Sequence, residues 1–372
     1  MEPVFKYVPC LKWKLGEYQA LLRLPSNLKD NLLPVFEVAE FFVGSPAASY
    51  DFEDGKPPRT IDQHLLKVAQ RIEQKWGAAT CLVDLRRVDA RARLRGGNHP
   101  FTYIFEGLRA RGVGAVPVIG PDPDDPSRVA IRDITKIDQN GLGVRCRLDA
   151  VSRPDIAAKV KAILIGINVD PEECHFILDI GAPDNFEPLD TLAAILETGL
   201  QRLPHLNRWR SLSMIGTSLP ASVRGLSAGI SILPRYEWKL YKRLKRRLGI
   251  SGVRVPTFGD YGVDHPSSLN LDMRFIYPKA AIRYSIPDGW LVARGDAIRG
   301  PKGVGLGQFR QLCHLIANSD HFSGSGFSVG DAYIGDCAAG RVKPGSPSRF
   351  REVGTSHHLS RIQHDLSSLG AD

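Results

Sequence analysis

Short apolar runs alternate with amphipathic segments through residue 261 of the chain. Eight runs have the length and composition of buried strands, and they occupy residues 7–14, 32–38, 80–87, 114–120, 143–150, 174–181, 211–218 and 253–261. The segments between them carry apolar residues at helical spacing, and they occupy residues 16–24, 60–76, 100–112, 126–141, 153–167, 188–203 and 236–249. Thr60 is a typical N-cap and Gly112 a typical C-cap of two of these predicted helices.

This alternation predicts an α/β fold with a parallel sheet. Eight strand–helix units in a segment of this length are typical of a (β/α)8 barrel of the TIM type. A doubly wound open sheet is the alternative, but it normally has fewer strands, and no glycine-rich dinucleotide turn follows the first strand. We therefore predict a barrel over residues 1–264.

Residues 265–372 do not continue the pattern and predict a C-terminal α+β extension that caps one face of the barrel. Residues 280–295 have the pattern of a β-hairpin around a Pro-Asp-Gly turn. Residues 305–322 predict a helix, and the glycine-rich residues 324–336 suggest a lid loop. A histidine-containing tail completes the extension and is expected to pack on the barrel.

Charged residues recur near the carboxyl ends of most predicted strands. Side chains along a barrel strand alternate between the interior and the helix layer, and barrel active sites lie at the carboxyl ends of the strands. The charged residues at late, inward positions are Lys12, Lys14, Glu37, Asp84, Arg86, Arg145, Arg147, Asp149, Asp179 and Asp260. The loop after the fourth strand adds Asp122 or Asp124 as candidates, whereas the seventh strand offers only Thr217 and Ser218.

These charges have two interpretations. Because an unpaired buried charge is costly, they can form a closed ion-pair network that fixes the barrel register. Alternatively they form a site whose basic groups clamp phosphate or carboxylate, since guanidinium groups match both. The ligand-binding residues of that site would be Lys12, Lys14, Arg86, Arg145, Arg147 and Asp260.

The candidate catalytic carboxylates are Asp179, Glu37 and Asp84. They can act as general acid and base if their neighbours push their pKa values apart, or they can hold Mg²⁺, which prefers oxygen ligands. Spacing does not decide between these roles, so the cofactor stays open. Lys14 offers a third chemistry, a Schiff base, for which Lys12 would supply the cationic neighbour that lowers its pKa.

The tail contains two adjacent histidines, His357 and His358. On a helix they point about 100° apart, so both cannot easily bind one metal. His358 is a candidate proton carrier at the barrel mouth, since histidine titrates near neutral pH. The alternative is a capping segment, a short C-terminal helix with Thr355 or Ser356 as N-cap.

The composition favours an anionic partner. The chain has 372 residues and a formal net charge of +9, and such an excess attracts anions without determining a fold. Residues 86–95 are rich in arginine and residues 236–249 form a basic helix, so nucleic-acid binding is one hypothesis and a solvated surface is the other. Six scattered cysteines without a C-x-x-C pair, no signal peptide and no apolar membrane span predict a cytoplasmic protein.

The segments "YVPCLKWKLGEYQAL", "LLPVFEV", "VDLRR", "FILDIG" and "GTSHHLSRI" resemble the beta protein family of bacteria and their phages. The resemblance implies a barrel-like fold and a link to phage or to antiphage defence, but no agreed reaction. Carried over by residue, it draws attention to Lys12, Lys14, Glu17, Glu37, Asp84, Arg86, Asp179, His357 and His358.

Two functional hypotheses follow. The first is a barrel enzyme that binds a phosphate-bearing ligand, a nucleotide or nucleic acid, and catalyses hydrolysis or transfer in phage–host conflict. The second is a non-catalytic sensor or interaction module that works with partner proteins of a defence system.

Overall fold

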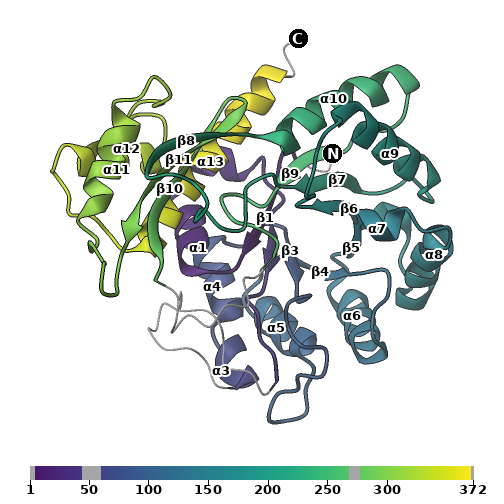
Figure 1. Cartoon of the computed structure of the whole chain (residues 1–372). Helices are drawn as coiled ribbons and strands as arrows, with labels where there is room; N and C mark the ends of the chain where they lie inside the picture. Colours follow the sequence, from purple (N-terminus) through teal and green to yellow (C-terminus); the bar gives the residue numbers. More distant parts are fainter. Residues whose placement is uncertain (1–4, 44–59, 268–276, 370–372) are drawn as a thin grey trace.

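The computed structural model describes residues 5–43, 60–267 and 277–369, and its centre is a closed barrel of parallel strands (Figure 1). In order around the barrel the strands are β1 (Val8–Lys12), β2 (Val35–Glu37), β3 (Cys81–Asp84), β4 (Ala115–Ile119), β5 (Leu142–Arg147), β6 (Cys174–Gly181), β7 (Ser211–Gly216) and β9 (Thr257–Asp260). Parallel pairing of Val8 with Gly259 joins the first strand to the last. The predicted (β/α)8 fold is confirmed.

Helices surround this barrel, and most begin where the sequence indicates. They are α1 (Leu15–Leu22), α2 (Ser26–Lys29), α3 (Ile61–Leu65), α4 (Val68–Lys75), α5 (Pro100–Arg109), α6 (Asp125–Asp138), α7 (Leu148–Val151), α8 (Ile156–Ile167), α9 (Leu189–Arg202) and α10 (Tyr236–Ser251). The Thr60 side chain accepts a hydrogen bond from the backbone N–H of Gln63, as its N-cap role predicts. His99 and Asp124 cap α5 and α6 in the same way, which places both side chains at the carboxyl ends of β3 and β4.

Apolar side chains fill the amino-terminal part of the barrel interior. Val8, Leu82, Val118, Ile177 and Ile215 belong to one buried cluster. Two glycines complete this layer, because a Cβ on Gly143 would lie 2.9 Å from Val118 Cγ2 and one on Gly259 would lie 2.5 Å from Ile215 Cγ2. The charged residues of the strands therefore begin one layer above a close-packed apolar floor.

The C-terminal extension contains an antiparallel sheet with the strand order β10–β11–β8. The predicted hairpin is β10 (Lys279–Ile286) and β11 (Gly289–Ala297). The third strand, β8 (Gly229–Pro234), was not predicted and precedes α10 in the chain. It pairs Leu233 with Trp290, so the sheet takes strands from both sides of β9.

Two further helices cover one side of this sheet (Figure 1). The first is α11 (Gln308–Ala317), as predicted, and the second is α12 (Val329–Ala338). Residues 324–336 were expected to form a lid loop. This expectation is wrong from Val329 onward, where α12 begins. Ser328 caps α12 by accepting a hydrogen bond from the Asp331 N–H, and Ile334 is buried against the sheet.

The chain ends in the long helix α13 (Pro347–Leu369), not in a short helix capped at Thr355 or Ser356. Both residues lie in its buried middle. α13 packs along α1, where a Cβ on Gly16 would lie 2.8 Å from Arg351 Cβ. Leu359 belongs to the same buried cluster as the helix-facing side of the barrel strands, so α13 serves as the last helix of the barrel layer.

Candidate functional site

Arg145 lies at the centre of a buried network of charged groups inside the barrel. Its Nη1 donates to Glu37 Oε1 and to Asp84 Oδ2, both at 2.8 Å. Its Nη2 donates to Asp179 Oδ2 at 2.9 Å and to the Tyr261 hydroxyl oxygen at 2.7 Å. Arg145, Glu37, Asp84 and Asp179 are each at most 4% exposed. One guanidinium therefore holds the carboxylates of three strands.

Both carboxylate oxygens of Asp179 are fully occupied. Oδ1 accepts from the Tyr261 hydroxyl at 2.6 Å and from the Gly181 N–H at 2.8 Å. Oδ2 accepts from Arg145 and also from Arg86 Nη1 at 2.9 Å. Both oxygens of Asp179 are thus used by hydrogen bonds within the network, and its catalytic role stays a prediction.

Glu37 is shared between the network and a second arginine. Arg87 Nε donates to Glu37 Oε2 at 2.7 Å, and its Nη1 donates to Glu40 Oε1 at 2.5 Å. Arg87 also donates to the backbone oxygen of Pro266. This arginine links the end of β3 to the segment after β9.

The three carboxyl groups do not share one pKa. Burial raises the pKa of Glu37, but Arg145 and its neighbouring arginines outweigh burial and lower the value to about 2. Burial also opposes ionisation of Asp179, and Arg145 again outweighs it, so the pKa of Asp179 is lowered. The pKa of Asp84 is raised, because burial outweighs Arg145 and the charge of Glu37 adds repulsion. Asp84 is the carboxyl of this network that is suited to carry a proton.

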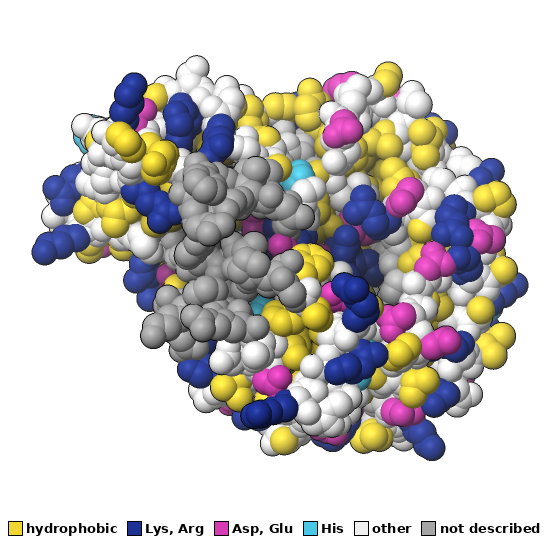
Figure 2. Space-filling model, turned by 60° about the horizontal axis from the view of Figure 1, so that its bottom comes forward, with side chains coloured by type: hydrophobic (Ala, Val, Ile, Leu, Met, Phe, Trp, Pro, Cys, Tyr) yellow, Lys and Arg dark blue, Asp and Glu magenta, His cyan; other side chains and the backbone are white. Residues whose placement is uncertain are grey.

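Two cavities open beside the network at the carboxyl ends of β3, β4 and β5. The larger has a volume of about 330 Å³, and we call it the arginine cavity because Arg86, Arg145, Arg147 and Arg153 line it together with Asp84. Dark blue side chains gather around a hollow on this face of the molecule (Figure 2). Its walls place several guanidinium groups around a small space, which is suited to an anion.

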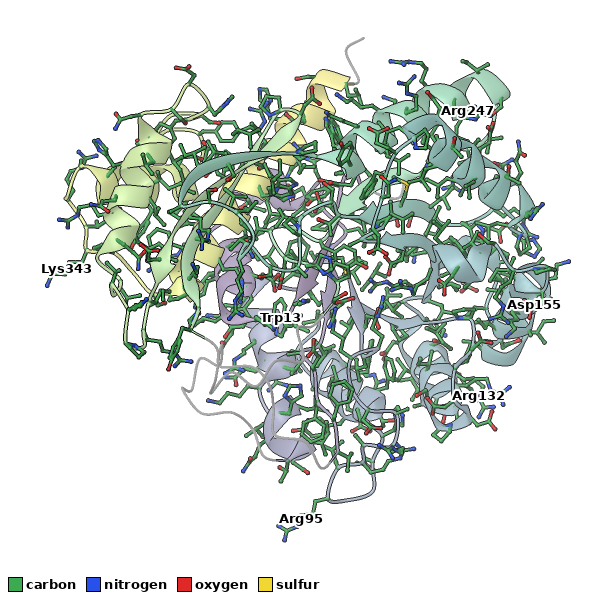
Figure 3. The ribbon with its side chains drawn as sticks, in the orientation of Figure 1. Trp13, Arg95, Arg132, Asp155, Arg247 and Lys343 are labelled. Atoms are coloured by element: carbon green, nitrogen blue, oxygen red, sulfur yellow. The ribbon has the colours of Figure 1, made fainter. Side chains whose placement is uncertain are left out.

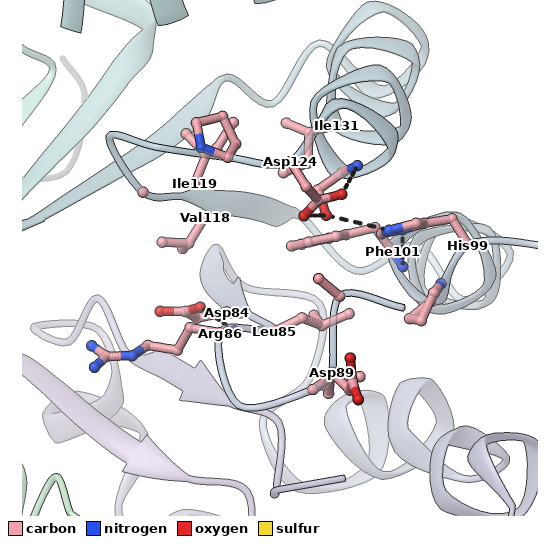
Figure 4. A pocket seen from close by; sticks show the side chains of 16 residues that line it. Asp84, Leu85, Arg86, Asp89, His99, Phe101, Val118, Ile119, Asp124 and Ile131 are labelled. Carbon is pink, nitrogen blue, oxygen red and sulfur yellow. Dashed lines mark hydrogen bonds between the residues drawn. The ribbon is translucent and has the colours of Figure 1, made fainter. Parts of the chain in front are cut away.

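The second cavity lies between the amino termini of α5 and α6, and we call it the α5–α6 cavity. Its volume is about 220 Å³. Figure 4 shows Asp84 and Arg86 on one side of it and His99 and Asp124 on the other. Asp84 therefore lines both cavities.

Of the arginines that line the arginine cavity, Arg147 has the most exposed side chain, and its closest ion pair is the loosest. Its side chain is 54% exposed, and it pairs with Asp149 at 3.5 Å. Its guanidinium lies over Gly181, where a Cβ would be 3.5 Å from Nη2. Arg86 is 31% exposed on its side chain and pairs with Asp179 at 2.9 Å. Arg153 is 41% exposed and pairs with two aspartates.

Strand parity correctly brought together Glu37, Asp84, Arg86, Arg145 and Asp179. It was less accurate for the rest of the fifth strand, because β5 ends at Arg147. Asp149 lies on α7 at the rim. Asp122, in the loop after β4, also reaches the rim of the arginine cavity.

The expectation that Asp260 faces the barrel interior is wrong. Its Oδ1 accepts from the Tyr7 hydroxyl at 2.6 Å, and its Oδ2 contacts His358 Nε2 of α13 at 2.8 Å. Phe258, on the same side of β9, packs against Trp238 of α10. The next residue, Tyr261, is the one that reaches the interior and Arg145.

His358 does not reach the barrel mouth, contrary to its predicted role as a proton carrier. It is fully buried, bound to Asp260, and stacked on Trp290 with ring centroids 4.8 Å apart. His357 points elsewhere, as two adjacent helical residues must. Its Nδ1 contacts Asp331 Oδ2 at 2.9 Å and its Nε2 contacts the Ser285 carbonyl oxygen at 2.7 Å.

Lys12, the last residue of β1, and Lys14, directly before α1, belong to a separate cluster between the barrel and the C-terminal extension. Lys12 lies beside Glu37 in register, but its Nζ pairs with Asp264 Oδ2 at 3.5 Å. Burial lowers the pKa of Lys14, and Arg351 and Lys12 lower it further against the effect of Asp264. A lowered pKa is what a Schiff-base lysine requires, and that role stays a hypothesis.

Glu17, on α1, belongs to the same cluster. Among the residues that the structure describes, none forms a hydrogen bond with either of its carboxylate oxygens, although Glu17 is only 1% exposed. Burial and the charge of Asp264 raise its pKa to about 8, against the opposing effect of Arg351. The cluster thus contains a glutamate that prefers its neutral form.

The two basic segments do not form one surface. Figure 3 places Arg95 of the first and Arg247 of the second at opposite edges of the molecule, so a nucleic acid would not contact both at once. The basic side chains of α10 are largely paired, for example Arg243 with Asp190 and Lys242 with Asp288. The arrangement favours the interpretation of a solvated helix face.

Several residues of the site were not predicted. Tyr261 was missed because parity was assigned one residue out of step on β9. Arg87 was missed because its side chain leaves the strand at the end and turns back to Glu37. Asp264 lies beyond the strand, where no periodicity applies. His99 had a signal, since it directly precedes a proline that begins a helix.

Metal ligation was one of the predicted roles of the carboxylates. Within residues 5–43, 60–267 and 277–369, no group of three or more His, Cys, Asp and Glu side chains is arranged to hold a metal ion. The carboxylates of the barrel bind arginine instead. No helix in the described part of the chain is long and apolar enough to cross a membrane.

A family model described as "Beta protein" matches residues 7–364. The chain belongs to the beta protein family. No curated protein matches it. The match runs from Tyr7, which donates to Asp260, to the last turns of α13. The family match therefore covers the barrel, the antiparallel sheet and most of α13.

Proposed function

We propose that this beta protein binds a phosphate-bearing anion in the arginine cavity and catalyses hydrolysis or transfer of its phosphate group. The observation that carries the proposal is a cavity of about 330 Å³ at the carboxyl ends of the strands, lined by several arginines and by Asp84. Barrel enzymes place their active sites at this end.

Arg147 and Arg86 are the anion-binding groups of the proposal. Their guanidinium heads are accessible, whereas Arg145 is buried and held by three carboxylates. A phosphate between the accessible heads would make charge-assisted hydrogen bonds with each of them. Arg145 then acts from below, as a fixed positive charge that orders the floor of the site.

Asp84 is the acid–base group of the proposal. Burial raises its pKa above that of an ordinary aspartate, and the residue lines the cavity in which the phosphate would sit. It would protonate the leaving oxygen of the ester, or accept a proton from an attacking hydroxyl group. Glu37 and Asp179, whose pKa values are lowered, stay ionised and hold Arg145 in place.

A non-catalytic sensor is the second candidate. It is favoured by the saturation of the network, because Arg145 uses its donors on carboxylates and both Asp179 oxygens are occupied. In this alternative the same cavity binds the anion, and protein partners respond to it. For both candidates we propose a role in phage–host conflict, which rests on the family resemblance, and a cytoplasmic location, which rests on the sequence composition.

Binding is tested with Arg147→Ala, and Arg132→Ala is its matched control on the exposed face of α6. Isothermal titration with inorganic phosphate and pyrophosphate is expected to give a dissociation constant at least about tenfold weaker for Arg147→Ala and unchanged for the control. Equal affinities for both variants, or no binding to the wild type, would contradict the anion site.

Asp84→Asn separates the two candidates. Turnover of a panel of phosphate monoesters and diesters is expected to fall by about 100-fold or more in this variant, while pyrophosphate binding persists. A wild type that binds pyrophosphate tightly but hydrolyses or transfers none of the panel would favour the sensor.

A further inference from the structure

The arginine cavity and the α5–α6 cavity adjoin each other. Asp84, Arg86, Val118, Ile119 and Gly120 line both, so the end of β4 and the turn after β3 form a common wall. We infer that one ligand occupies both, with its phosphate in the arginine cavity and a planar ring in the α5–α6 cavity, as in a single nucleotide. The inference rests on the proposed function and names its ligand class.

The α5–α6 cavity has the walls that a planar ring requires. Val118, Ile119 and Ile131 give it an apolar surface. His99 and Phe101 lie nearly parallel, with an interplanar angle of 4° and ring centroids 5.8 Å apart (Figure 4). Nucleobases stack on aromatic side chains because every base has a π-face.

His99 presents a neutral ring to this cavity. Its Nδ1 accepts a hydrogen bond from the Phe101 N–H at 3.2 Å, so the proton of the neutral ring is on Nε2, 3.3 Å from Ser127 Oγ. Burial lowers the pKa of His99, and Arg93 lowers it further against the effect of Asp124. A neutral imidazole gives no attraction for phosphate.

The charges of the two cavities determine which cavity holds the phosphate and which holds the base. The arginine cavity is lined by four arginines and three aspartates, whereas the α5–α6 cavity is lined by one arginine and three aspartates. The α5–α6 cavity has Asp89 and Asp124 on its wall, and Arg86 lies where it meets the arginine cavity. Carboxylates repel a phosphate but accept hydrogen bonds from the amino group of a base. The phosphate therefore belongs on the β5 side and the base between α5 and α6.

The size of the two cavities fits a free nucleotide. The arginine cavity, of about 330 Å³, is in the range of small-ligand sites, and the α5–α6 cavity adds about 220 Å³ beside it. Arg86 and Asp89 of the first basic segment line the cavities, and no residue of the second segment does. Arg95 and Arg247, farther along the two segments, lie at opposite edges of the molecule (Figure 3). One nucleotide therefore fills the adjoining cavities without contact to the second segment.

The test compares AMP with ribose 5-phosphate, which has the same sugar phosphate but no base. Isothermal titration of the wild type is expected to give a dissociation constant at least about tenfold lower for AMP, because base stacking adds affinity. His99→Asn keeps a side chain that can cap α5 but removes the ring. This variant is expected to bind AMP only as tightly as ribose 5-phosphate. Its affinity for ribose 5-phosphate is expected to equal that of the wild type.

His314→Asn, an exposed histidine on α11, is the matched control and should leave both affinities unchanged. Equal affinities of the wild type for AMP and ribose 5-phosphate would overturn the base site while leaving the phosphate site intact. Preference for AMP that survives in His99→Asn would overturn the placement of the base. Failure of both ligands to bind the wild type would overturn the inference together with the proposed anion site.

Discussion

Two buried glutamates of this protein have pKa values shifted in opposite directions. Glu37 is surrounded by arginines, which lower its pKa to about 2 against the effect of burial. Glu17 is buried without a hydrogen-bond partner among the described residues, and its pKa rises to about 8. Burial is common to both, so the difference lies in the hydrogen-bonded guanidinium groups that only Glu37 has.

Glu17→Gln is expected to stabilise the protein at alkaline pH. The folded chain holds a proton on Glu17 up to about pH 8, whereas the unfolded chain releases it near pH 4.3. The free energy of unfolding of the wild type therefore falls as pH rises from about 4.3 to about 8. The variant has no carboxyl group at this position and does not lose this stability. We expect a gain of up to about 5 kcal/mol at about pH 9 and of about 1 kcal/mol at about pH 5.

Urea denaturation across that pH range measures the effect. Glu106→Gln, an exposed glutamate on α5, is the matched control and should follow the wild type. A Glu17→Gln variant whose pH profile is parallel to that of the wild type would show that Glu17 ionises normally.

Arg145→Met is expected to lower the free energy of unfolding by about 3–5 kcal/mol near neutral pH, because it leaves buried carboxylates without their main counter-ion. In the wild type the lowered pKa of Glu37 adds stability above about pH 4.3 that is lost as pH falls toward 2. Without Arg145 the carboxyl groups bind protons more readily, so the deficit should shrink on acidification.

Chemical denaturation at about pH 7 and pH 4 tests this, and Arg132→Met on the exposed face of α6 is the control. If Arg145→Met is too unstable to purify, Arg145→Lys keeps the charge and removes the planar fork. A loss of stability that is the same at both pH values would contradict the ion network as its cause.

At the scale of single elements, the regular strands were predictable and the irregular ones were not. Glu37, Asp84, Arg145 and Asp179 could be predicted because each lies in the second half of a strand with one clear inward face. On β9, the large residue Phe258 precedes Gly259 and the charged residue Asp260 follows it. Sequence alone therefore could not show that Phe258 faces α10 and Tyr261 faces Arg145.

The elements that the sequence missed depend on distant partners. β8 pairs with β11, which follows β9 in the chain, and no local pattern specifies that pairing. α13 contains glycine, threonine, serine and two histidines in its middle, a composition of low helix propensity. It is buried against α1 on one side and against β10 on another, so tertiary packing and not amphipathic periodicity stabilises it.

At the scale of the molecule, the barrel and the extension are not separable along the chain. The last barrel helix is α13, which follows the sheet and both of its helices (Figure 1). Its His358 binds Asp260 at the end of β9, and Asp260 in turn accepts from Tyr7 at the start of β1. The closing pair of barrel strands is therefore held from outside by the C-terminal residues.

A chain truncated to residues 1–264 is consequently expected to fail to fold as a barrel. It would keep every barrel strand but leave Asp260 without His358 and the charged cluster around Lys12 without Arg351. Near-ultraviolet circular dichroism and urea denaturation should show no cooperative transition, whereas a chain of residues 5–369 should unfold like the full chain. Adding a peptide of residues 347–369 should not restore it fully, because Trp290, which stacks on His358, would still be missing. Cooperative unfolding of residues 1–264 with a midpoint near that of the full chain would show that the barrel closes without α13.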